Sequence, residues 1–107
     1  MYEEVIEDIK SVVKCSAWVI LQTQDKDPFT VNYGQRIQEC INTLSNINVT
    51  TLDDVSYVEV MLLHISGTVH LMQNSKSLGT NNHSLICFKR ACAKLKATTK
   101  HILDPMR

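Results

Sequence analysis

Histidine and cysteine are the residues of this chain best suited to catalysis or metal binding, and the chain contains four of each. They are His64, His70, His83, His101, Cys15, Cys40, Cys87 and Cys92. His64 and His70 are six residues apart in one helical segment, so they do not share a helix face. Cys87 and Cys92 are five residues apart and lack the C-x-x-C or H-x-x-x-H spacing of a zinc site. We therefore expect no metal site and no cofactor, and structural or surface roles for the histidines.

The motifs that mark common enzyme classes are also missing from the sequence. It has no glycine-rich phosphate loop, no G-x-S-x-G, no H-E-x-x-H and no pair of carboxylates in an apolar setting. We therefore expect that the protein is not an enzyme. Its 11 basic residues balance 11 acidic residues, which argues against a dedicated nucleic-acid-binding protein.

The composition suits one helical domain. A chain of 107 residues is about the size of a single domain, and an apolar content of 44% supplies a core. Three glycines and two prolines are too few for the turns of a β-sandwich or barrel. No apolar run approaches the roughly 18–20 residues of a membrane span, and the acidic start MYEEVIED is unlike a signal peptide. We expect neither a membrane span nor a targeting segment.

Apolar residues recur with the helical period of 3.6 in four segments, the first two over about residues 2–23 and 28–46. The other two carry their stripes over residues 55–72 and 85–102, with alternating spacings of three and four. The residues predicted to face the core are Tyr2, Val5, Ile9, Val12, Ser16 and Val19; Tyr33, Ile37, Cys40, Ile41, Leu44 and Ile47; Val55, Val58, Leu62, Ile65, Val69 and Met72; and Leu85, Phe88, Cys92, Leu95, Thr99 and Ile102.

Local signals mark where these segments begin and end. Asp27-Pro28 has the form of an N-cap followed by proline at the first helical position. Thr51 and Asp54 resemble a capping box, with Asp in place of the usual Glu or Gln. Gly79, within the stretch KSLGTNN, divides the third segment from the fourth, and Asp104-Pro105 ends the fourth.

Short connections favour an all-α fold, an antiparallel up-down-up-down four-helix bundle formed as a single domain by residues 1–107. We expect it to be monomeric. Residues 1–60 carry ten acids and four bases, whereas residues 61–107 carry one acid and seven bases. In this topology the first helix lies beside the fourth, so we expect its acidic start to face the lysines of the fourth helix.

One flank of the fourth helix carries Lys89, Ala93, Lys96 and Lys100. The small side chain of Ala93 leaves a gap that the lysines border, and such a surface suits an acidic amphipathic helix. The alternative is a solvated basic face that only pairs with the first helix. The third helix also has apolar residues outside its core stripe, including Val60 and Leu63, which is more apolar surface than a solvated helix needs.

The opening Y-E-E-V-I-E-D-I-K-S-V-V-K is similar to the first helix of the focal adhesion targeting family of four-helix bundles, which begins with tyrosine-x-x-valine. The resemblance to this family covers nearly the whole chain. DPFTVNYGQRIQECINTL, VEVMLLHISGTVHLMQN and SLICFKRACAKLKATTKHIL resemble its other three helices in length and phase. The C-terminal bundle of GIT-type Arf GTPase-activating adaptors is about equally similar. The fourth segment here is more basic and less rich in alanine.

The resemblance implies a cytoplasmic adaptor at cell-adhesion sites that binds leucine-rich LD motifs of paxillin-like scaffolds. These motifs bind as added helices between the first and fourth helices, or between the second and third. By position, the first groove would use Ile6, Ile9, Val13, Lys89, Ala93, Lys96 and Lys100, and the second would use Arg36, Val60 and Leu63. Tyr2 in Y-E-E-V resembles an SH2-domain ligand once phosphorylated, although it also fits a tyrosine at the edge of the core.

Two other classes of protein stay open. The stretch V-K-C-S-A-W-V-I-L resembles the small helical cofactor subunit of nidovirus replicases, which binds a polymerase and assists RNA copying. A secreted helical cytokine would explain an even number of cysteines and the sequons at Asn48 and Asn82. Because the cysteines lie inside apolar helical stretches, we expect free, reduced thiols.

Overall fold

A computed structural model describes residues 2–74 and 82–107 of the chain. Four α-helices account for most of this part: α1 (Glu3–Thr23), α2 (Pro28–Asn46), α3 (Leu52–Gln73) and α4 (His83–Leu103). A short 3-10 helix, η1 (Asp104–Met106), follows α4 directly. No strand occurs in the described residues, so the all-α prediction is confirmed. The predicted break at Gly79 lies outside the described residues.

The helices begin where the local signals predict. The Asp27 carboxylate accepts a hydrogen bond from the Thr30 backbone N–H at 3.1 Å, so Asp27 caps α2 and Pro28 is its first residue. Thr51 and Asp54 form a capping box at the start of α3, with each side chain accepting from the backbone N–H of the other residue. Asn82 caps α4 through the N–H of Leu85 at 3.0 Å.

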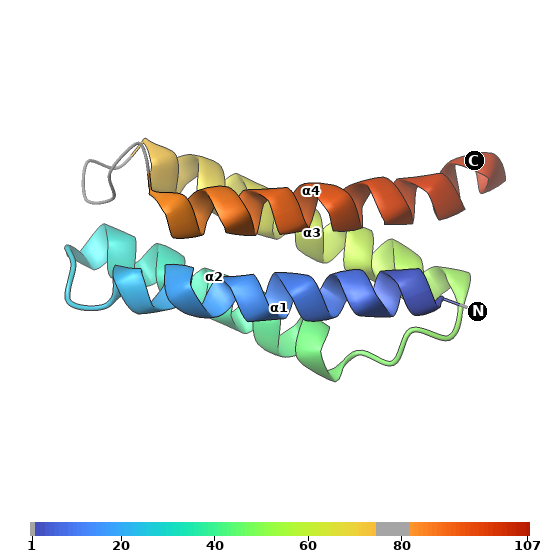
Figure 1. The fold of residues 1–107 in the computed structure, drawn as a ribbon, viewed down its shortest axis with the longest axis horizontal. Helices are drawn as coiled ribbons and strands as arrows, with labels where there is room; N and C mark the ends of the chain where they lie inside the picture. Colours follow the sequence, from blue (N-terminus) through green and yellow to red (C-terminus); the bar gives the residue numbers. More distant parts are fainter. Residues whose placement is uncertain (1, 75–81) are drawn as a thin grey trace.

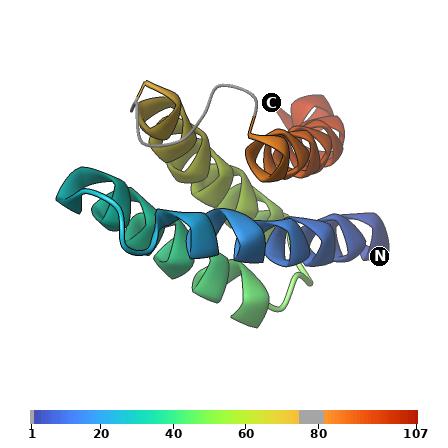
Figure 2. The same ribbon diagram turned by 60° about the vertical axis from the view of Figure 1, so that its left-hand side comes forward.

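The four helices surround one apolar core, and each packs against two others in the order α1–α2–α3–α4–α1. In Figures 1 and 2, α3 and α4 lie above α1 and α2. The whole measures 41 × 23 × 20 Å, and both chain termini lie near one end of its long axis (Figure 1). The predicted neighbourhood of the first and fourth helices is therefore present.

The core consists largely of the predicted stripes. All six stripe residues of α3 are buried, and in α4 only Ile102 remains half-buried. Tyr2, Tyr33, Cys40 and Ile47 are also half-buried and lie at the edge of the core. The carbonyl oxygen of Tyr2 accepts a hydrogen bond from Ile6 N–H at 3.0 Å, and Tyr2 is the N-cap residue of α1.

A buried carboxylate joins α1 to α4. Asp8 is only 3% exposed, accepts a hydrogen bond from Thr98 Oγ1 at 2.6 Å and lies 3.3 Å from the Lys94 ammonium. Further along α1, Gln22 donates to Ser84 Oγ at 3.3 Å. Residues later in α1 therefore contact residues earlier in α4. Of the acidic residues at the start of α1, Asp8 pairs with α4, and its partner is Lys94 rather than a lysine of the predicted groove. Glu7 pairs instead with Lys10 of α1.

The helix α3 is unusually apolar. An 18-residue window within it has a mean hydropathy of 1.3, and by length and composition alone it could cross a membrane. One third of that window is buried inside the bundle. Core helices of soluble proteins have the same properties, so the absence of a span remains a prediction.

Candidate functional site

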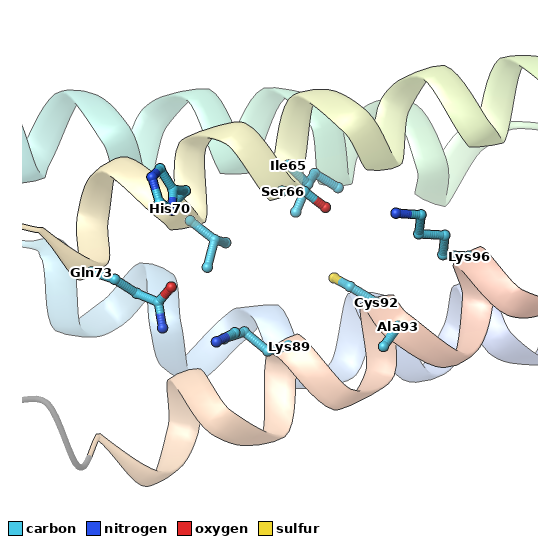
Figure 3. Close-up of a pocket in the computed structure, with 9 residues that line it drawn as sticks. Ile65, Ser66, His70, Gln73, Lys89, Cys92, Ala93 and Lys96 are labelled. Atoms are coloured by element: carbon cyan, nitrogen blue, oxygen red, sulfur yellow. The ribbon is translucent and has the colours of Figure 1, made fainter.

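A groove of about 310 Å³ lies between α3 and α4. Its floor is apolar, because Ile65, Val69 and Cys92 belong to the core stripes of the two helices. Its α4 edge consists of Lys89, Ala93 and Lys96, and its α3 edge consists of Ser66, His70 and Gln73. In Figure 3, Lys89, Lys96 and the Cys92 sulfur extend from α4 into the space beside α3.

Equal spacing on the two helices builds this groove. Ser66, His70 and Gln73 on α3 and Lys89, Ala93 and Lys96 on α4 both follow steps of four and three residues. Such a spacing places each set on one helix face, directly beside the core stripe. The Ala93 side chain is only a methyl group, so the α4 edge of the groove is most open between Lys89 and Lys96.

The groove is positively charged. It carries the ammonium groups of Lys89 and Lys96, and none of its lining residues is acidic. Burial, together with the nearby Cys15, raises the pKa of the Cys92 thiol to about 12. Cys92 is therefore a neutral, apolar part of the floor at neutral pH, and not a nucleophile.

The predicted α1 residues do not line this groove. Ile6, Ile9 and Val13 line a different groove of about 320 Å³ between α1 and α2. The remaining walls of that groove are Lys10, Lys14, Leu44, Ser45, Ile47 and Val49. The structure thus does not bring the two halves of the expected first groove together: α1 contributes to one groove and the lysine flank of α4 contributes to another.

The interface between α1 and α4 is built from other residues. Besides Asp8 and Lys94, it has a cavity of about 480 Å³ lined by Ser11, Lys14, Cys15, Trp18, His83, Ser84 and Cys87. Lys100 lies one turn after Lys96 on the same flank of α4 and is exposed. The correction has a simple geometric origin: the lysine flank of α4 faces α3, and the opposite flank faces α1.

The hollow found between α2 and α3 has other walls than the second predicted groove. The hollow between α2 and α3 is lined by Asn42, Thr43, Asn46, Ile47 and Tyr57. Arg36, Val60 and Leu63 are absent from that lining among the described residues. Val60 is 43% exposed and Leu63 is 60% exposed, and both lie away from the core stripe of α3.

Sequence reasoning missed the α3 wall of the groove. The only signal for it was the row of Ser66, His70 and Gln73 along one edge of the heptad stripe. That row indicates a polar edge, but it does not say which helix lies beside it. In the described part of the chain, no three His, Cys, Asp or Glu side chains are grouped so that they could hold a metal ion.

Comparison with known proteins adds no relative. No family model, no curated protein and no solved structure matches this chain.

Proposed function

We propose that this chain is an antiparallel, up-down-up-down four-helix bundle that acts as a non-catalytic adaptor and binds an acidic amphipathic helix between α3 and α4. The observation that carries the proposal is the groove itself, with its apolar floor, two lysines on one edge and no acidic lining residue. The resemblance to focal adhesion targeting domains supports the same class of ligand, an LD-type helix of a cytoplasmic scaffold at cell-adhesion sites.

The spacing of the lysines defines the ligand. Lys89 and Lys96 are seven residues apart, which corresponds to two turns or about 10.5 Å along α4. A helix lying along the groove meets both ammonium groups if it carries carboxylates seven residues apart on one edge. The leucines of the ligand helix, on the face next to the carboxylates, would then enter the groove beside the small Ala93 side chain and contact Val69 and Cys92.

The polar edge on α3 completes the match. Ser66 and Gln73 carry hydrogen-bonding groups on the opposite side of the groove from the lysines. A docked helix therefore has one acidic edge against α4 and one neutral polar edge against α3. This asymmetry fixes the direction in which the ligand can dock.

The proposal is tested by titrating a peptide of ~20 residues, about 30 Å long as a helix, with leucines on one face and carboxylates on the adjacent edge. We expect a micromolar dissociation constant, about −8 kcal/mol, and weaker binding at high salt. A peptide in which lysines replace the carboxylates should not bind. Failure of the acidic peptide to bind would leave α4 as a solvated basic face.

Two matched pairs of variants locate the site. Ala93→Glu places bulk and negative charge in the groove and should abolish binding, whereas Ala97→Glu, one turn later on the exposed surface of α4, should not. Lys89→Ala with Lys96→Ala should weaken binding modestly, mainly through the association rate. Lys10→Ala with Lys14→Ala makes the same charge change beside the α1–α2 groove and should have little effect.

A further inference from the structure

The α1–α2 groove is an apolar hollow that the helix-binding proposal does not use. Its volume of about 320 Å³ lies near the lower end of the range for small-molecule sites. Its apolar lining consists of three buried side chains, Ile9, Leu44 and Val49, and three half-buried ones, Ile6, Val13 and Ile47. A ligand that fills this groove must therefore be small and largely apolar.

The charged residues of this groove are two lysines. Lys10 and Lys14 line it, and none of its described lining residues is acidic. Lys10 lies 3.3 Å from Glu7, but these two side chains are 69% and 70% exposed, so the ion pair is weak and exchanges easily. Lys14 is also exposed, and within the described part of the chain no carboxylate lies within ion-pair distance of it. Both ammonium groups can therefore bind an anion.

The spacing of these lysines suits a single anionic group. Lys10 and Lys14 are four residues apart, so their Cβ atoms are neighbours on the helix surface, about 5–6 Å apart. Two flexible ammonium groups at this spacing can contact the same carboxylate. Lys89 and Lys96 are seven residues apart, about 10.5 Å along α4, which suits two separate carboxylates. The two grooves therefore select different ligands.

The apolar surface beside the lysines is long enough for an alkyl chain. Along α1 it runs from Ile6 to Val13, seven residues or about 10.5 Å. Ile47, near the end of α2, lines the same groove, so a chain lying there would contact both helices. The small volume favours one chain over the paired chains of a membrane lipid.

We propose that the α1–α2 groove binds a medium-chain alkyl carboxylate. The carboxylate lies between the Lys10 and Lys14 ammonium groups, and the chain lies along Ile6, Val13 and Ile47. The charge of the groove and the charge of the ligand are complementary, and the apolar lining removes the chain from water. The site lies apart from the α3–α4 groove, so this proposal does not rest on helix binding.

The test titrates decanoate into the isotope-labelled protein at neutral pH, below the critical micelle concentration of decanoate. We expect saturable chemical-shift changes at the amides of Ile6, Val13 and Ile47, and little change at Val69 and Ala93 in the α3–α4 groove. The changes should weaken at high salt, because salt screens the attraction between the carboxylate and the lysines. Decylammonium has a comparable chain and a positive head group, so it should leave these amides unshifted.

Two comparisons separate the roles of the head group and the chain. Lys10→Ala with Lys14→Ala should weaken decanoate binding about tenfold, the loss expected from two exposed ion pairs. Lys89→Ala with Lys96→Ala makes the same charge change at the other groove and should leave decanoate binding unchanged. In a series from hexanoate to decanoate, each added methylene that is buried should tighten binding by up to about fourfold.

Several results would overturn the proposal. Equal shifts with decylammonium, or unchanged decanoate binding in the Lys10 and Lys14 double variant, would show that the lysines do not select the ligand. Decanoate shifts confined to the α3–α4 groove, or no shifts at all, would show that the α1–α2 groove is not the site. Binding only above the critical micelle concentration, or only to vesicles of anionic phospholipid, would show that the protein recognises an aggregate or a membrane surface instead.

Discussion

The two described helix-interior glycines allow a sharp test of how α1 and α2 pack. A Cβ atom added at Gly34 of α2 would lie 2.0 Å from Thr23 Oγ1 and 2.7 Å from Thr23 Cβ. Thr23 cannot easily move, because it is 2% exposed and its hydroxyl donates to the Ile20 carbonyl at 2.6 Å. At Gly67 of α3, an added Cβ would meet nothing within 4 Å. The same Gly→Ala change should therefore have opposite effects at the two positions.

The magnitudes follow from two competing effects. Alanine is about 1 kcal/mol more favourable than glycine in a helix interior, so Gly67→Ala should stabilise the protein by about that amount. Overpacking costs roughly 1–3 kcal/mol, and contacts this short place Gly34→Ala near the upper value. The net effect at Gly34 is a loss of about 2 kcal/mol. At about 4 °C for each kcal/mol, the Tm should fall by about 8 °C for Gly34→Ala and rise by about 4 °C for Gly67→Ala.

Urea unfolding and thermal melts followed by circular dichroism measure both variants against the wild type. Unchanged slopes of the urea transition would show that the variants unfold from the same compact state. If Gly34→Ala is as stable as Gly67→Ala, then α1 and α2 do not approach each other at Thr23, and the packing of this pair described here is wrong.

Three further predictions concern the core, the α3 cap and the thiols. Leu62 is 2% exposed, so Leu62→Ala should cost about 2–5 kcal/mol in denaturant unfolding, and a loss under about 1 kcal/mol would place it outside the core. Backbone N–H groups of Thr50 and then Thr51, followed by the Thr51 hydroxyl, lower the Asp54 pKa below its ordinary 3.8. The ionised Asp54 carboxylate therefore stabilises the folded protein at pH values above 3.8, and this stabilisation is lost as the pH falls through the lower pKa of the folded state. Asp54→Asn should be less stable than the wild type at neutral pH and nearly as stable as the wild type in unfolding measured at about pH 2. Labelling of the unfolded, unreduced protein should find all four thiols, whereas two or none would favour a disulfide-bonded secreted cytokine.

The helices and the core were predictable because their signals are local or periodic. Asp27, Thr51 and Asp54 cap helices with their own neighbours in sequence, so three or four residues suffice to recognise each cap. The stripes follow the helical period, and the burial of Leu62 and Phe88 confirms their phase. The antiparallel order of all four helices stays part of the proposal.

The groove was only half predictable, because a helical period shows which residues share a face and not which helix lies beside it. Lys89, Ala93 and Lys96 were correctly grouped, but their flank could face α1 or α3 depending on the hand in which the helices follow one another around the core. Asp8 is an acidic residue inside the apolar pattern of α1, and it was the sequence feature that could have shown which flank of α4 faces α1. Its buried contacts with Thr98 and Lys94 identify the other flank of α4 as the one that faces α1.

Chemical-shift mapping on the isotope-labelled protein tests whether an acidic amphipathic helix docks between α3 and α4. On adding the acidic peptide, the largest shifts should fall on the backbone amides of the two groove edges. These are Ser66, His70, Gln73, Lys89, Ala93 and Lys96. Amides of Ile6 and Val13, in the α1–α2 groove, should shift little. Shifts concentrated at Ile6 and Val13, on the outer face of α3 around Val60 and Leu63, or nowhere at all would contradict the account.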